Sequence, residues 1–231
     1  MIAARERLLA RDVEVARGRL DPSMVLNLTG YPGGGSILQD RSLYRNNGTI
    51  SGATWVRTPG GLWCLSFDGT DDSVDCGDNP SHNCDTRLYL AAWVYNESTA
   101  AGQIFQRKSA ANVYCYRLYT NSKTSLTFDV WNASNVRVYQ DFNCAGDKWE
   151  FVECFYDGAN IWGAVNFIES TKKAQTGQIQ QVTAHLYLGR NVVDSNQPFK
   201  GRIALPQVCN AIPTTSQRTS FYNATRHLFG I

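Results

Sequence analysis

Residues 62–77, with the sequence LWCLSFDGTDDSVDCG, constrain the fold more than any other stretch of the chain. An apolar run ends at Asp68-Gly69, and a second, alternating run follows it. Both faces of the first run are apolar, which predicts a strand inside a sheet rather than at its edge. Glycine accepts the positive φ that a compact turn requires. The stretch therefore predicts two strands joined as a hairpin.

The second half of this stretch carries more carboxylates than a core can hold. Such side chains must face water, cap backbone N–H groups or bind a cation. The aspartates concerned are Asp71, Asp72 and Asp75 within the stretch and Asp78 directly after it.

Composition favours one large β-domain. The chain has 231 residues, 22 basic and 20 acidic side chains and a net charge of +2. No basic run with interleaved aromatic residues lies beyond the N-terminus, so we expect no nucleic-acid partner. Aromatic runs alternate with clusters of Gly, Asn, Asp and Ser, a pattern typical of many strands joined by turns.

Residues 65–74, LSFDGTDDSV, resemble the sFDGvdDyV signature of laminin-G-like, concanavalin A-like jelly-roll domains. Shorter matches follow in the family's order, among them Ala92-Trp93-Val94, Trp149, Asp157-Gly158 and Gly201. The resemblance implies an all-β fold, an antiparallel two-sheet jelly-roll sandwich over residues 22–231 with a short C-terminal helix. This sandwich hosts lectins, glycanases, adhesion modules and virion parts, so the fold alone does not define the function.

The order of the apolar runs predicts where several of these elements lie. Regular spacing predicts a meander of antiparallel strands, followed by a strand pair and a final helix over residues 214–228 with Thr215 as its cap. The strands are expected at residues 87–95, 104–106, 113–119, 126–131, 136–142, 148–154 and 161–167.

Residues 1–21 lie outside the resemblance and are predicted to form an N-terminal helical arm, helical over residues 3–17. The arm is either a frayed extension or an assembly segment whose apolar face binds a neighbouring subunit. The candidate assembly residues are Arg5, Leu8, Leu9 and Arg11. Charges interrupt this segment and no later run approaches about 20 apolar residues, so we expect neither a signal peptide nor a membrane span.

Seven cysteines are present, and four of them lie in apolar, strand-like runs that predict buried thiols: Cys64, Cys115, Cys154 and Cys209. Cys76 and Cys84 flank a short loop, and the sequence leaves open whether they form a disulfide. The three histidines are dispersed, which gives no zinc-site pattern.

The resemblance also implies a structural calcium ion. In relatives, a loop like residues 40–48 and the carboxylates after the FDG-type turn supply its oxygen ligands. The candidates here are Asp40 and Asp72. This chain has Ala204 where the family usually has Asp, and the alternative is that both aspartates only cap turns.

Several aromatic residues in the meander have two interpretations. Either they pack, or an outward row of rings forms a platform for sugars or for another protein. The candidate ligand-binding residues are Tyr116, Trp131 and Tyr139.

Catalytic groups are not apparent. Glycanases need two facing carboxylates, but Glu150 and Glu153 are three positions apart and should lie on opposite faces of a strand. We therefore expect no enzyme activity.

The function expected from the sequence is a non-catalytic structural and recognition module of a larger assembly. A virion protein, such as a capsid decoration, head or fibre protein, fits a sandwich with an assembly arm and no export signal. Oligomerisation, partner subunits and a location in a virion or at an extracellular surface are then expected. One alternative is a free-standing carbohydrate-binding protein assisted by calcium, and another is a divergent glycan hydrolase whose two acids come from distant strands.

Overall fold

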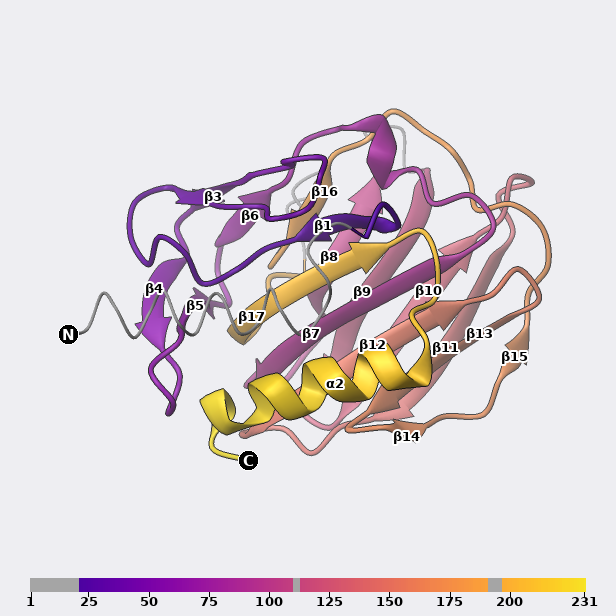
Figure 1. The fold of residues 1–231 in the computed structure, drawn as a ribbon. Helices are drawn as coiled ribbons and strands as arrows, with labels where there is room; N and C mark the ends of the chain where they lie inside the picture. The colour runs from indigo at the N-terminus through magenta and orange to yellow at the C-terminus, as the bar shows by residue number, and fades with distance from the viewer. Residues whose placement is uncertain (1–20, 110–112, 191–196) are drawn as a thin grey trace.

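Two antiparallel β-sheets lie face to face in the computed structural model of the chain (Figure 1). The structure describes residues 21–109, 113–190 and 197–231. The predicted arm and its four assembly residues lie outside these ranges and stay a prediction. The fold is the predicted jelly-roll sandwich with a short C-terminal helix.

One sheet has nine strands in the order β14-β13-β12-β7-β17-β5-β4, with β1 paired to β17 and β15 paired to β13. Its strands are β1 (Met24–Asn27), β4 (Thr54–Arg57), β5 (Trp63–Asp68), β7 (Leu88–Asn96), β12 (Trp149–Tyr156), β13 (Asn160–Val165), β14 (Ile168–Glu169), β15 (Lys173–Ala174) and β17 (Lys200–Cys209). As predicted, β5 lies inside this sheet, between β4 and β17.

The other sheet has eight strands in the order β11-β10-β9-β8-β16-β6-β3-β2. Its strands are β2 (Ile37–Leu38), β3 (Gly48–Ser51), β6 (Ser73–Asp75), β8 (Gly102–Lys108), β9 (Tyr114–Ser122), β10 (Ser125–Trp131), β11 (Arg137–Asn143) and β16 (Leu186–Leu188). The consecutive neighbours β8, β9, β10 and β11 are the predicted meander.

The hairpin predicted for residues 62–77 is wrong. The turn after Asp68 exists, with Gly69 at a φ of 84°, but β5 belongs to the nine-stranded sheet and β6 to the eight-stranded sheet. At the end of β5, the backbone N–H of Asp68 donates to Asp72 Oδ2 at 2.7 Å rather than to a partner strand. An Asp-Gly turn determines where the chain reverses, but it does not determine which sheet the next strand joins.

Alternation along the strands gives the sandwich two cores. In β12, Val152 and Cys154 face the core between the sheets. Phe151 and Phe155 face the opposite way, toward a second core under helix α2 (Thr215–Thr225) and the 3-10 turn η2 (Arg226–Phe229). In Figure 1, α2 lies in front of the nine-stranded sheet, and the β8–β11 meander lies behind it.

The N-cap of helix α2 lies one residue earlier than predicted. Thr214, not Thr215, is the N-cap, and it forms a reciprocal capping box with Gln217. The helix is joined to the sheet by a buried ion pair, in which Arg218 donates to both carboxylate oxygens of Glu153 at 2.7 and 3.0 Å. Trp93 Nε1 also donates to Thr225 Oγ1 at 3.0 Å.

All seven cysteines are free thiols. The four predicted to lie in the core are buried, and Cys76 and Cys84 are buried without a bond between them. A small 3-10 turn, η1 (Pro80–His82), precedes Cys84.

Candidate ligand-binding face

The meander presents a row of charged and aromatic side chains on the outer face of the eight-stranded sheet. In β10, Phe128 and Val130 enter the core between the sheets. Asp129 lies between them in sequence and therefore projects from the opposite face.

The register of the strands extends this row. Asp129 is paired with Arg117 in β9 and with Tyr139 in β11, and Arg117 is paired with Gln106 in β8. Directly opposite residues of an antiparallel pair share one face. We define the β9–β11 face by the neighbouring side chains of these three strands: Tyr114, Arg117, Tyr119, Asp129, Trp131, Arg137 and Tyr139.

Asp129 is the electrostatic centre of the β9–β11 face. Its carboxylate is fully buried, and its Oδ2 accepts hydrogen bonds from Nε of Arg117 and Nε of Arg137, both at 2.8 Å. Burial acts to lower the pKa of Arg137, but the hydrogen bond to Asp129 and its charge outweigh burial and raise that pKa. The second oxygen, Asp129 Oδ1, has no hydrogen-bond partner.

The aromatic rings of the face lie against cations. The guanidinium carbon of Arg117 is 4.3 Å from the ring centre of Tyr119 and 5.4 Å from that of Trp131. Trp131 is stacked on Tyr114 with their ring centres 4.5 Å apart. These contacts leave little of Trp131 open, since only 7% of its surface is exposed.

Tyr139 is the accessible ring of the face, with 42% of its surface exposed. The guanidinium carbon of Arg137 lies 4.6 Å from its ring centre, and Nζ of Lys173 lies 4.3 Å from it. Such distances fall within the range of cation–π contacts.

Of the three predicted ligand residues, the structure brings Trp131 and Tyr139 to one face and separates Tyr116 from them. Tyr116 is fully buried in the core between the sheets, and its hydroxyl donates to the carbonyl of His82 at 3.3 Å. The packing interpretation therefore applies to Tyr116. Sequence reasoning missed Arg117, Asp129 and Arg137, because only the pairing register of three strands brings them together.

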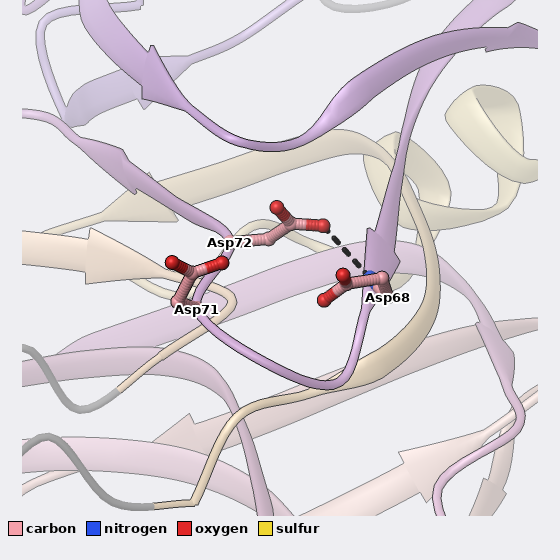
Figure 2. A group of neighbouring side chains, drawn as sticks. All are labelled: Asp68, Asp71 and Asp72. Atoms are coloured by element: carbon pink, nitrogen blue, oxygen red, sulfur yellow. Dashed lines mark hydrogen bonds between the residues drawn. The ribbon is translucent and has the colours of Figure 1, made fainter.

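Three carboxylates converge at the turn between β5 and β6 (Figure 2). One ligand atom from each of Asp68, Asp71 and Asp72 lies within 4.8 Å of the others. Burial, with the neighbouring charges of Asp68 and Asp71, raises the pKa of Asp72, although its hydrogen bond from the Asp68 backbone opposes this. A Cβ on Gly52 would lie 2.1 Å from Asp72 Oδ1, so only glycine leaves room beside this carboxylate. Oxygen donors held this closely fit a hard cation such as calcium.

Asp40 is not part of this group. Its two oxygens accept hydrogen bonds from the backbone N–H groups of Asn27, Ser42 and Asn46 at 2.7 to 2.9 Å. The Ser42 hydroxyl also donates to it at 2.6 Å. Asp40 therefore organises its own loop, which is the turn-capping alternative.

Glu150 and Glu153 lie on opposite faces of β12, as predicted. Glu150 accepts the backbone N–H of Ala145 at 2.8 Å, whereas Glu153 is paired with Arg218 beneath α2. Ala204, which stands where the family usually has Asp, is buried in the core under the same helix.

The two-sheet fold, with a polar and aromatic outer face, is that of a lectin-like β-sandwich. The chain belongs to the concanavalin A-like lectin/glucanases superfamily, whose sequence profile matches residues 68–217. No curated protein sequence matches the chain.

Solved structures with a similar fold include binding domains of botulinum neurotoxins and of Paraclostridial Mosquitocidal Protein 1. The binding domain of botulinum neurotoxin DC in complex with SialylT has a TM-score of 0.64 at 15% identity, over 87% of this chain and 51% of that chain. The serotype D binding domain has a TM-score of 0.66 at 10% identity, over 91% of this chain and 53% of that chain. The binding domain of Paraclostridial Mosquitocidal Protein 1 has a TM-score of 0.63 at 9% identity, over 89% of this chain and 52% of that chain. At these low identities, the TM-scores show a shared fold alone. The chain spans about half the length of these chains.

Within the described ranges, no helix is long and apolar enough to cross a membrane.

Proposed function

We propose that the chain is a non-catalytic glycan-binding module and that the β9–β11 face is its binding site. The observation that carries this proposal is the buried Asp129, held by two arginines and surrounded by aromatic rings on an outward face. Superfamily membership and the binding-domain folds of the structural neighbours support a binding role.

The face offers the chemistry that a sugar needs. The exposed ring of Tyr139 can pack on an apolar sugar face. The partly exposed guanidinium of Arg137, 4.6 Å from the centre of that ring, can donate to sugar hydroxyl groups.

A glycan array followed by titration of the hits tests this function. We expect Tyr139→Ala to weaken binding of a hit by about tenfold, because the change removes the accessible ring. Tyr44→Ala is the matched control, since Tyr44 is similarly exposed, at 39%, but lies outside this face. An array without hits, or equal losses in the two variants, would contradict the proposal.

A structural calcium ion at Asp68, Asp71 and Asp72 is a separate proposal. When bound, the ion would neutralise three neighbouring carboxylates and hold the turn between the two sheets. Calcium should then raise the Tm of the protein by mass action, and Asp71→Asn should reduce that rise. Asp147→Asn, at an exposed ion pair with Lys123, should leave the rise intact. A Tm that does not respond to calcium would contradict this proposal.

The assembly role, including a place in a virion, also stays a proposal. It depends on residues 3–17, and exposed apolar side chains near the first strand support it: Tyr31, Ile37, Leu43 and Tyr44. Light scattering of the full chain and of a chain beginning at Asp21 tests it. The proposal predicts an oligomer that becomes a monomer when the arm is removed, and a monomer in both cases would contradict it.

A further inference from the structure

We infer that the β9–β11 face selects acidic glycans, those that carry a carboxylate or a sulfate group, over neutral ones. This inference rests on the proposed glycan-binding function and names the ligand class of the same site.

The described side chains of the β9–β11 face carry more positive than negative charge. One carboxylate oxygen, Asp129 Oδ2, engages Nε of both Arg117 and Arg137. Two guanidinium groups therefore share one buried negative charge. Nζ of Lys173 adds a further positive charge beside the same ring of Tyr139. Asp141, two residues from Tyr139 on the same side of β11, is a second acid and accepts a hydrogen bond from Thr127. The two acids carry less charge than the three cations.

The arginines also keep donors for a ligand. Asp129 accepts hydrogen bonds from the Nε atoms of both arginines, so their terminal nitrogens are not hydrogen-bonded to this carboxylate. Arg137 Nη2 donates to the Tyr119 hydroxyl at 3.3 Å, and the terminal nitrogens of Arg117 donate to no residue in the described parts of the chain. The side chain of Arg137 is 37% exposed against 12% for Arg117, so Arg137 is the guanidinium that presents donors suited to a carboxylate or sulfate at the surface.

The rings argue against a purely neutral ligand. A neutral sugar stacks its apolar face on an open aromatic ring, but Trp131 is covered by Tyr114 and by Arg117. The exposed ring, Tyr139, lies beside both Arg137 and Lys173. A sugar that stacks on Tyr139 therefore meets two cations, and an acidic group on that sugar would pair with them.

Matched oligosaccharides test the inference with the full chain. Tetragalacturonic acid is compared with its methyl ester, and a sulfated galactan oligosaccharide with its desulfated form, by calorimetric titration. We expect the charged member of at least one pair to bind about tenfold more tightly, since hydrogen bonds to charged groups are the stronger ones. The pair that responds distinguishes carboxylate from sulfate recognition. The preference should shrink as salt is raised.

Variants locate the effect. Arg137→Gln and Lys173→Gln should each remove most of the preference for the charged member while binding of the neutral member persists. Both side chains are at least partly exposed, so circular dichroism should show an intact fold. Arg202→Gln is the control, because it removes the same charge from β17, beside Tyr95 in the other sheet.

Equal affinity for the charged and neutral members would overturn this inference and leave glycan binding standing. Polyglutamate that binds as tightly as tetragalacturonic acid would also overturn it, because the face would then bind charge and not sugar. If neither these oligosaccharides nor a broad glycan array gives binding, both the inference and the proposed function are wrong.

Discussion

Asp129 determines where the two arginines of the β9–β11 face lie. It is fully buried, yet it lies on the outer side of its strand, and it fixes two arginines that would otherwise sample many conformations. The arginines in turn cover the rings around it.

Asp129→Asn should destabilise the fold by roughly 3 kcal/mol, because removing one partner of a buried ion pair leaves the others uncompensated. Urea unfolding measures this change. Asp147→Asn, which removes an exposed ion pair with Lys123, is the control and should leave stability unchanged. Equal unfolding midpoints for Asp129→Asn and the unmodified protein would show that the buried pair adds nothing.

His82 should make stability depend on pH. Burial, reinforced by the neighbouring charge of Arg107, lowers its pKa from 6.5 to about 4. The unfolded chain therefore binds a proton more readily than the folded chain. The stability associated with neutral His82 is fully present above pH 6.5 and is lost as the pH falls toward 4. The loss amounts to roughly 3 kcal/mol.

Unfolding measured between pH 7 and pH 4 checks this prediction. His82→Gln should flatten the dependence even if it lowers stability throughout. His185→Gln should retain the dependence, since His185 is about half exposed and contacts Asp75 at the surface. An unchanged slope in His82→Gln would contradict the assignment.

At the scale of the element, helix α2 is held by its contacts with the sheet more than by its own sequence. Its cap, Thr214, is exposed, but Arg218, Phe221 and Thr225 are buried against the nine-stranded sheet. The Glu153–Arg218 pair is the central polar contact of that interface, and Tyr89 adds a hydrogen bond to Glu153 at 2.8 Å.

Glu153→Gln should therefore cost more than the loss of the cap. We expect roughly 3 to 5 kcal/mol for breaking the buried pair, against about 1 kcal/mol for Thr214→Ala. Hydrogen exchange should show α2 opening before the sheets in Glu153→Gln. A smaller effect for Glu153→Gln than for Thr214→Ala would mean that apolar packing alone holds the helix.

The elements also show what sequence could and could not predict. Alternation and turn residues placed the meander, the β12–β13 pair and the final helix, because these depend on local patterns. The placement of β5 and β6 in different sheets could not be predicted, since an Asp-Gly turn does not determine which sheet the next strand joins. The contact of Arg117, Asp129 and Arg137 requires the register of three strands, and no local pattern contains that register.

At the scale of the whole molecule, the sandwich has two different sides. The nine-stranded sheet is covered by α2 and η2, whereas the β9–β11 face looks outward from the other sheet. Family resemblance predicted the architecture well, because order and spacing of short motifs are shared across the superfamily. The residues of the β9–β11 face could not be predicted in the same way, because Tyr116 and Arg117 are adjacent in sequence but lie on opposite sides of the sheet.

Hydrogen exchange of the full chain, with and without a glycan identified on the array, tests the central claim most directly. We expect slowed exchange in β9, β10 and β11, with α2 and the Asp68–Asp72 turn unchanged, and loss of that protection in Tyr139→Ala. Protection confined to the Asp68–Asp72 turn or to α2 would place the binding site elsewhere and contradict the account.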